Sequence, residues 1–306
     1  MPPQLSLLQA AQQFNNQFGK DNIARVFKEP VFIVSAPRAG STLLFEQLQK
    51  TSGLWSIGSE SHIVFRQFPH LQAENQQLDS GCLNASHADK NISELIKACF
   101  TLMLKNFQGK PYLGPHPEFN PVTFLEKTPR NALNIPFLLE LFPDAKFIYL
   151  YRDPRENIAS IIEAWKLGLK SGRFVTFRNL PQWHLPAWCL LLPPKWQQLR
   201  EKPLAEIASF QWCESNRIIN ENLSRIKPER FSRISYSELI NKPAESLKAL
   251  AEFTGHPCDE LSQFSNALPL SKTTLTAPHP DKWKKYENEI LDLQPQWSKV
   301  WGNINS

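Results

Sequence analysis

Cysteine is sparse and scattered in this chain of 306 residues, and its pattern excludes two kinds of site. The five cysteines form no C-x-x-C pair and no cluster with histidine. A disulfide framework needs paired cysteines, and a zinc site needs closely spaced Cys or His ligands, so neither is indicated. They lie at Cys82, Cys99, Cys189, Cys213 and Cys258. This usage is typical of a reducing compartment.

Long hydrophobic runs and long basic runs are also missing. No apolar stretch approaches the roughly 20 residues that cross a bilayer, and the N-terminus lacks the apolar core of a signal peptide. The net charge is only +5, and lysines and arginines form no long run. We therefore expect a cytoplasmic protein with no membrane span and no nucleic-acid partner, whose mild positive charge suits an anionic ligand.

The chain instead alternates short apolar runs with segments of helical spacing. One run begins at Val31, and further strands are predicted at 122–127, 146–151 and 231–236. Residues 54–66 are predicted to form a short strand that runs into a loop or the start of a helix. Helical spacing is found at 43–48, 92–107, 132–142, 153–168, 204–226 and 244–254. Strands that alternate with helices predict an α/β fold, here a P-loop-like parallel sheet with helices on both faces.

The domain organisation that we expect is simple. Residues 1–28 form either an N-terminal amphipathic helix or a linker, and residues 29–306 form one domain, since no repeat or long linker demands a second. Residues 173–203 interrupt the pattern with several Trp and Pro residues. Such a segment packs by aromatic burial, and we interpret it as an insert that acts as a cap or lid.

The turn after the first strand has the composition of an anion site. Within residues 37–42, Gly40 lets the backbone approach closely, Ser41 and Thr42 offer hydroxyls, and Arg38 adds a cation. A strand-turn-helix of this kind directs backbone N–H groups and the positive end of a helix at one point. The same pattern also arises where the arginine is merely solvated.

This turn differs from the nucleotide-triphosphate loop G-x-x-x-x-G-K-[ST]. Its first glycine is replaced by Ser35, and no lysine separates Gly40 from Ser41. In that loop the lysine binds the β- and γ-phosphates and the hydroxyl holds Mg²⁺. The turn therefore suits a shorter anion without a γ-phosphate and without a metal.

Three other predicted strand ends carry polar groups, and ligands of open parallel sheets bind at those ends. Glu126 and Lys127 end one strand, Arg152 ends the next, and Tyr236 ends the last. Ser160 lies two turns into the helix after Arg152, so the two side chains can hold one phosphate together. Either residue alone is more often an ordinary surface group.

These motifs resemble those of the sulfotransferases that use 3′-phosphoadenosine 5′-phosphosulfate (PAPS). The run Pro37-Arg38-Ala39-Gly40-Ser41-Thr42-Leu43 resembles their loop for the 5′-phosphosulfate. The run Arg152-Asp153-Pro154-Arg155-Glu156-Asn157-Ile158-Ala159-Ser160 resembles their 3′-phosphate motif. Tyr236-Ser237-Glu238-Leu239 resembles a later segment whose Tyr lies near the adenine. The Trp/Pro-rich insert and Gln211-Trp212 resemble the bacterial branch, and the likeness covers roughly residues 30–290.

The resemblance implies a reaction and a set of donor contacts. A sulfuryl group passes from PAPS to a hydroxyl acceptor, adenosine 3′,5′-bisphosphate (PAP) is released, and no metal takes part. Residues 37–42 then bind the phosphosulfate, Arg152 and Ser160 bind the 3′-phosphate, and Tyr236 lies by the adenine. Ser271 resembles a donor-contacting serine of the tyrosylprotein branch.

The resemblance also implies catalytic residues but leaves the base open. Arg38 and Lys127 are expected to stabilise the transferring sulfuryl group, and Lys127 resembles the catalytic lysine of the tyrosylprotein branch. The acceptor hydroxyl needs a base within reach. Glu60 lies where that branch carries its catalytic glutamate, while His62 and His279 are alternatives. The chain lacks the Lys-Thr-His run of the cytosolic branch.

The acceptor is the least defined part of the prediction. Tryptophans and leucines in 174–199 suggest an apolar hydroxyl acceptor, either a small molecule or a hydroxyacyl chain tethered to a carrier protein, although such residues usually pack a core. Two other functions compete with sulfuryl transfer. One is a P-loop kinase with a degenerate loop, and the other is a non-catalytic module that binds adenosine bisphosphate or a protein.

Overall fold

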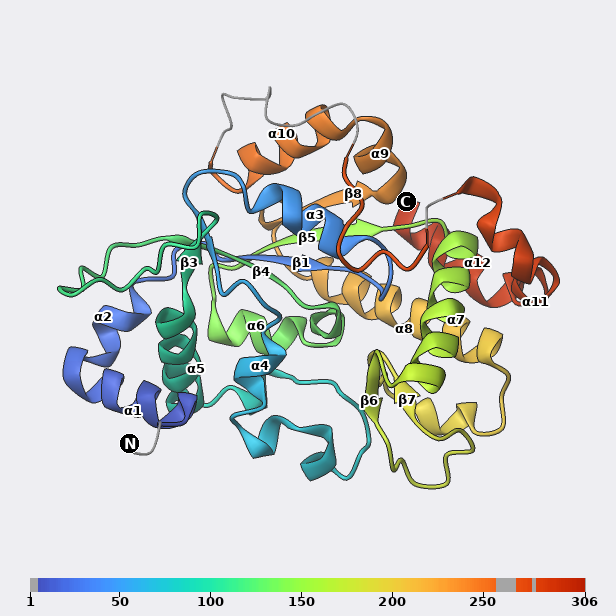
Figure 1. Cartoon of the computed structure of the whole chain (residues 1–306), viewed down its shortest axis with the longest axis horizontal. Helices are drawn as coiled ribbons and strands as arrows, with labels where there is room; N and C mark the ends of the chain where they lie inside the picture. Colours follow the sequence, from blue (N-terminus) through green and yellow to red (C-terminus); the bar gives the residue numbers. More distant parts are fainter. Residues whose placement is uncertain (1–4, 257–267, 277–278, 306) are drawn as a thin grey trace.

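A six-stranded sheet forms the centre of the computed structural model, which describes residues 5–256, 268–276 and 279–305 (Figure 1). The strand order is β3-β2-β4-β1-β5-β8, and every pair is parallel except β2 with β3. The strands are β1 (Val31–Val34), β2 (Leu54–Ser56), β3 (Lys105–Asn106), β4 (Thr123–Lys127), β5 (Lys146–Tyr151) and β8 (Phe231–Ser235). Only the antiparallel edge strand β3 was not predicted.

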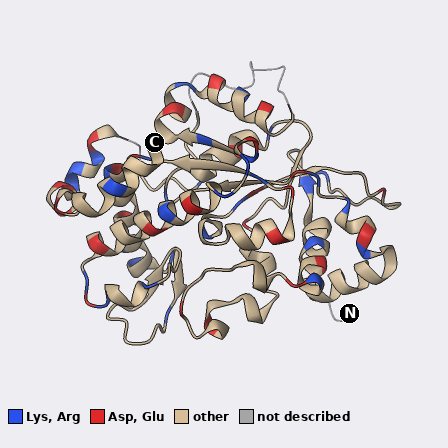
Figure 2. Ribbon diagram, turned by 180° about the vertical axis from the view of Figure 1, so that it is seen from behind, with Lys and Arg blue, Asp and Glu red and all other residues tan. Residues whose placement is uncertain are grey.

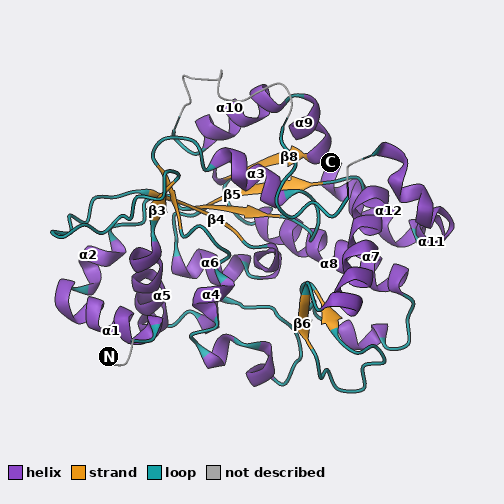
Figure 3. Cartoon of the chain, viewed as in Figure 1, coloured by secondary structure: helices purple, strands orange, loops and turns teal. Residues whose placement is uncertain are grey.

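Helices cover both faces of the sheet, as Figure 3 shows, which confirms the predicted α/β class. One face packs against α3 (Ser41–Leu48), α9 (Tyr236–Asn241) and α10 (Pro243–Phe253). The other carries α5 (Lys90–Met103), α6 (Ile135–Leu141), α7 (Pro154–Ser171) and α8 (Leu204–Leu223). Alternate residues of β1 serve the two sides: Val31 and Ile33 join one apolar cluster, and Phe32 joins the other.

Shorter elements extend these layers. At the N-terminal end, α1 (Leu7–Phe18) and α2 (Lys20–Ala24) pack against α5. At the C-terminal end, α11 (Glu287–Asp292) and α12 (Gln294–Asn305) lie beside α7 and α8. The remaining helix is α4 (His62–Phe65), and the 3₁₀ turns are η1 (Pro69–Leu71), η2 (Ala73–Gln76), η3 (Ala85–His87), η4 (Pro129–Leu133), η5 (Trp196–Leu199), η6 (Pro228–Arg230) and η8 (Pro280–Tyr286).

The Trp/Pro-rich insert packs by aromatic burial, as predicted. Trp188 is fully buried, and its ring centroid lies 5.2 Å from that of Trp165 on α7. Gln211 of α8 accepts a hydrogen bond from the Trp165 indole and donates to the carbonyls of Cys189 and Leu191. Sequence analysis did not predict the hairpin of β6 (Val175–Phe177) and β7 (Trp188–Cys189).

The short strand predicted at the start of 54–66 is β2, and α4 follows it as predicted. Three other predicted boundaries were wrong. The helix expected at 92–107 ends at Met103, and β3 follows it. The strand expected to include Tyr236 ends one residue earlier, because Ser235 and Glu238 form a capping box that starts α9. The helix expected at 132–142 is a 3₁₀ turn followed by α6.

Candidate active site

A cleft of about 550 Å³ opens at the carboxyl edge of the parallel strands. The turns after β1, β2, β4, β5 and β8 line it together with β6 and residues 268–276. The predicted site residues that line it are Pro37, Arg38, Gly40, Ser41, Thr42, Glu60, Arg152, Ser160, Tyr236, Ser271 and His279. Three others do not line it: Ala39 is buried within the turn, and His62 and Lys127 contact Glu60.

The turn after β1 leaves hydrogen-bond donors at the start of a helix. Gly40 has φ of 109°, and no side chain caps the first turn of α3, which begins at Ser41. The first N–H groups of a helix have no partner within the helix, so this end favours an anion. Asn157 of α7 is buried and donates to the Pro37 carbonyl over 2.8 Å. Asn157 lies within the motif 152–160, but the sequence alone did not predict its contact with the turn.

Arg38 extends from this turn into a region of positive charge. Its guanidinium donates to the Thr273 carbonyl over 3.1 Å and lies over the Phe174 ring. Burial lowers the pKa of Arg38 to about 10, helped by the charges of Arg173 and Arg152 and opposed by Glu163. Its buried Nε has no hydrogen-bond partner among the described residues. A bound anion would relieve both the repulsion and the missing hydrogen bond.

Arg152 stands at the end of the neighbouring strand β5. Its Nη2 lies 2.9 Å from Glu156 Oε2, and its guanidinium carbon lies 4.4 Å from the centre of the Tyr236 ring. Ser160 lies two turns along α7 and faces the same cleft. The spacing predicted from the sequence therefore brings Arg152, Ser160 and Tyr236 to one side of the cleft.

Glu60 lies opposite, after β2, and is held by two cationic or potentially cationic neighbours. Lys127 Nζ lies 2.7 Å from Glu60 Oε1, and His62 Nδ1 lies 3.3 Å from Oε2. Burial raises the pKa of Glu60, but hydrogen bonds from His62 and Lys127 and the charge of Lys127 outweigh it and hold the pKa at about 2. Glu60 is therefore a carboxylate at neutral pH.

A buried polar network fixes the backbone beside Glu60. The Ser61 N–H donates to Thr128 Oγ1 over 2.8 Å and to Glu126 Oε1 over 3.1 Å. Asn131 donates to the other oxygen of Glu126 over 2.9 Å. Burial raises the pKa of Glu126, while the hydrogen bonds from Thr128, Ser61 and Asn131 lower it. Glu126 thus faces this network and not the cleft, where strand-end reasoning had placed it.

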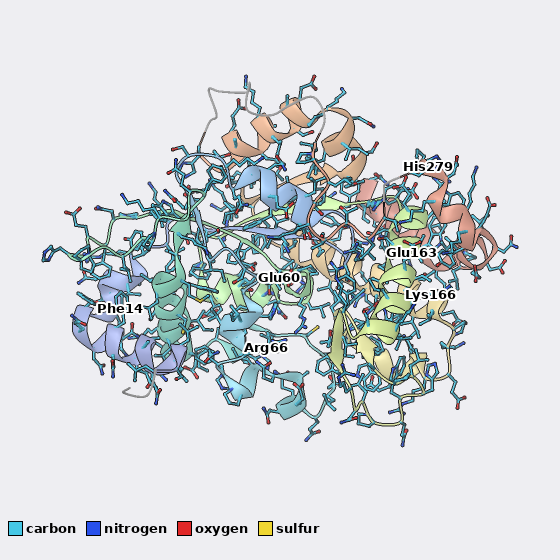
Figure 4. The ribbon with its side chains drawn as sticks, in the orientation of Figure 1. Phe14, Glu60, Arg66, Glu163, Lys166 and His279 are labelled. Carbon is cyan, nitrogen blue, oxygen red and sulfur yellow. The ribbon has the colours of Figure 1, made fainter. Side chains whose placement is uncertain are left out.

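The other candidate bases are placed differently. His279 Nδ1 accepts a hydrogen bond from the Asp281 N–H over 3.1 Å, so it caps η8. Figure 4 shows His279 apart from Glu60, on the side of α7 and the C-terminal helices.

Ser271, the predicted donor contact, lines the cleft, and its hydroxyl lies 3.1 Å from that of Thr273.

The sheet order divides the cleft into two sides. Strands β1, β5 and β8 supply Arg38, Arg152 and Tyr236 on one side, while β2 and β4 lead to Glu60 and Lys127 on the other. Sequence analysis missed several lining residues, because their position depends on contacts between distant segments. They include Arg130, Glu163, Phe174 and Lys282, of which Glu163 and Lys282 form an ion pair over 2.8 Å.

The described residues contain neither a candidate metal site nor a helix able to span a membrane. No group of three or more His, Cys, Asp or Glu side chains in that part of the chain could hold a metal ion. None of its helices combines the length and the apolar character needed to span a bilayer. Figure 2 shows acidic and basic residues interspersed over the helices, with most of the sheet uncharged.

The close approach of Gly40 and Tyr236 gives a test of the site's construction. A Cβ on Gly40 would lie 2.6 Å from Tyr236 Cδ2, in addition to the strain of a positive φ. We expect Gly40→Ala to lower the free energy of unfolding by more than the roughly 1–3 kcal/mol of backbone strain. In a Tyr236→Ala background only the strain remains, so the cost should fall. Urea unfolding of the double-mutant cycle measures the difference.

Gly109→Ala is the matched control for this cycle. Gly109 also has a positive φ, 83°, but a Cβ there meets nothing within 4 Å. Its substitution should therefore cost the same in both backgrounds. An equal cost of Gly40→Ala with and without the Tyr236 ring would contradict the described packing.

Comparison with known proteins shows which family this chain resembles. A model described as the sulfotransferase family matches residues 30–260. A protein-tyrosine sulfotransferase of Drosophila melanogaster is 22% identical over 255 residues, which cover 79% of this chain and 42% of that protein. An omega-hydroxy-beta-dihydromenaquinone-9 sulfotransferase of Mycobacterium bovis is 28% identical over 182 residues, which cover 60% of this chain and 40% of that protein. The chain thus spans about two fifths of the length of these curated relatives.

Solved structures agree on the fold. Sulfotransferase STF9 from Mycobacterium avium superposes with a TM-score of 0.52 at 16% identity, over 96% of this chain and 81% of that chain. The family match extends over all six strands of the sheet and over the turns after β1, β2, β4, β5 and β8 that frame the cleft. The chain therefore belongs to the sulfotransferase family, as the sequence motifs indicated.

Proposed function

We propose that this protein transfers a sulfuryl group from PAPS to a hydroxyl acceptor, with PAP as the second product. Family membership supports sulfotransferase activity. The proposal of PAPS as donor and a hydroxyl as acceptor rests on one observation. Two candidate anion sites, residues 37–42 and Arg152 with Ser160, share one cleft with Glu60, which pairs with Lys127.

The residues on the β1–β5 side fit the donor. The uncapped start of α3, with Ser41 and Thr42, suits the 5′-phosphosulfate, and Arg38 has a buried Nε free to donate. Arg152 and Ser160 suit the 3′-phosphate, with Tyr236 and Ser271 beside the remainder of the nucleotide. The donor supplies an activated sulfuryl group, and the cations Arg38 and Lys127 would stabilise the negative charge on the group in transfer.

The composition of the turn disfavours a kinase. Gly40 is followed directly by Ser41, so the lysine that contacts β- and γ-phosphates in nucleotide-triphosphate loops is missing. We therefore propose a donor site that needs no divalent metal.

On the β2–β4 side, Glu60 is the proposed base. It is ionised at neutral pH and lines the cleft, so it can accept the proton of the acceptor hydroxyl. A pKa of about 2 makes it a weak base while Lys127 remains paired with it. If the anionic donor draws Lys127 away, the pKa of Glu60 rises toward its ordinary value and its basicity increases. Donor binding would thus prepare the base.

The acceptor is proposed to be apolar around its hydroxyl. Phe174, Val175, Leu190 and Leu191 of the insert line the cleft. The names of the two relatives indicate a protein tyrosine and an omega-hydroxylated dihydromenaquinone as their acceptors. Both carry a hydroxyl, so a small molecule or a carrier-bound hydroxyacyl chain is compatible with this wall.

We also propose that residues 29–306 form a single domain, in which residues 173–203 cap the cleft.

Arg152 gives a prediction for the 3′-phosphate. Removal of a charge-assisted hydrogen bond costs roughly 1.5–3 kcal/mol. Arg152→Ala should therefore weaken PAP about tenfold or more, while adenosine 5′-phosphate, which lacks the 3′ group, should change little. Calorimetric titration of both ligands measures the difference.

Arg217→Ala is the control, because Arg217 pairs with Glu214 and Glu221 on α8 and does not line the cleft. It should leave both affinities nearly unchanged. If Arg152→Ala weakens the affinities for PAP and for adenosine 5′-phosphate equally, Arg152 does not bind the 3′-phosphate.

Glu60 gives a prediction for catalysis. Glu60→Gln should keep PAP affinity but reduce single-turnover sulfuryl transfer by roughly two to four decades. Since the pKa of Glu60 is about 2, the wild-type rate should show no limb where imidazoles titrate. The rates are measured with saturating labelled donor and a panel of hydroxyl acceptors.

His62→Asn and His279→Asn are the matched variants. Each should cost much less than Glu60→Gln, because His62 contacts Glu60 and His279 caps η8. A near wild-type rate for Glu60→Gln would rule Glu60 out. A large loss in either histidine variant, with removal of an imidazole limb, would assign the base there. If wild-type protein binds PAP but transfers nothing, it is a binding module.

A further inference from the structure

Arg130 is a cation of the cleft for which the described residues supply no hydrogen-bond or ion-pair partner. It lies in η4, directly after Pro129 and three residues beyond Lys127, and it lines the cleft. Its side chain is half-buried, yet it forms no hydrogen bond or ion pair within the described residues. Arginines in such positions are usually paired, because burying an uncompensated charge is costly.

The neighbours of Arg130 do not neutralise it. Burial lowers the pKa of Arg130, the charge of Arg66 lowers it further, and the charges of Glu60 and Glu74 oppose this. Glu60 Oε1 is paired with Lys127 over 2.7 Å, and His62 Nδ1 lies 3.3 Å from Oε2. Arg66 ends α4, six residues after Glu60, and is exposed (Figure 4). A surplus of positive charge therefore remains beside the proposed base.

The position of Arg130 in the sheet separates it from the donor groups. Arg38 and Arg152 follow β1 and β5, whereas Arg130 follows β4, on the side of Glu60. In a direct displacement the acceptor approaches from the side opposite the leaving group, so the β2–β4 side receives the acceptor. The apolar wall of Phe174, Val175 and Leu191 lines the same cleft.

We propose that Arg130 binds an anionic group of the acceptor, a carboxylate or a phosphate monoester, close to the hydroxyl that is sulfated. The acceptor is then an amphiphile whose hydroxyl and anion lie toward one end and whose apolar body lies along the insert. This inference rests on the proposed function, since it takes the β2–β4 side as the acceptor side. The unpaired guanidinium supplies the binding energy and the orientation.

The test compares anionic and neutral ligands of one shape. Calorimetry of the protein saturated with PAP is carried out with 3-hydroxydodecanoate, 3-hydroxydodecyl phosphate and dodecane-1,3-diol. We expect at least one anionic probe to bind the wild-type protein more tightly than the diol. Arg130→Met should weaken that probe about tenfold or more and leave the diol unchanged. Arg130→Lys should retain part of the affinity, because it keeps the charge.

Two controls separate this inference from other effects. Arg217→Met removes an arginine paired with Glu214 and Glu221 on α8, away from the cleft, and should change no probe. The PAP affinity of each variant is measured first, and circular dichroism verifies its fold. A wild-type protein that does not bind PAP contradicts the proposed function instead, and the probes are then titrated without PAP.

Several outcomes would overturn the inference. One is equal weakening of the anionic probes and the diol by Arg130→Met, which would mark Arg130 as a packing residue. Another is loss of PAP affinity with unchanged probe binding, which would assign Arg130 to the donor. Failure of both anionic probes to bind the wild-type protein more tightly than the diol would also reject it. If only one anionic probe responds, its head group identifies the acceptor class.

Discussion

Positive charge held at one edge of a parallel sheet is the constraint around which this structure is built. Arg38, Arg130 and Arg152 all follow strands whose carboxyl ends meet there. Repulsion and burial lower the pKa of Arg38 to about 10, so the arrangement costs free energy in the absence of an anion. The apolar clusters on the two faces of the sheet compensate for that cost. A site that is unfavourable when empty favours binding of a multiply charged anion.

The contacts of Glu60 link the positive charge at this edge of the sheet to the proposed sulfuryl transfer. Lys127 pairs with Glu60, and in the proposed function the same lysine stabilises the negative charge of the group in transfer. Ser61 and Thr128 hold the backbone on either side through the buried carboxylate of Glu126. The proposed base, its cationic partner and their support therefore follow two strands that are adjacent in the sheet, although Glu60 and Lys127 are 67 residues apart in the chain.

Local sequence patterns predicted much of this site, because the relevant geometry is local. The turn at 37–42 and the spacing of Arg152 and Ser160 depend on one strand and the helix that follows it. Parallel pairing then brings strand ends together without further information. The sequence could not show that Glu126 faces inward, that Arg130 has no ion-pair partner in the described part of the chain, or that Phe174 lies against Arg38. Each of these depends on segments that are distant in the chain, where periodicity carries no signal.

The central claim is that the cleft binds an adenosine bisphosphate without a metal. It is tested most directly by calorimetric titration of PAP with and without EDTA, beside ATP with Mg²⁺. The account predicts the same PAP affinity in both buffers and much weaker binding of ATP with Mg²⁺, because the turn has no lysine after Gly40. Loss of PAP binding on chelation, or tighter binding of ATP with Mg²⁺, would contradict it.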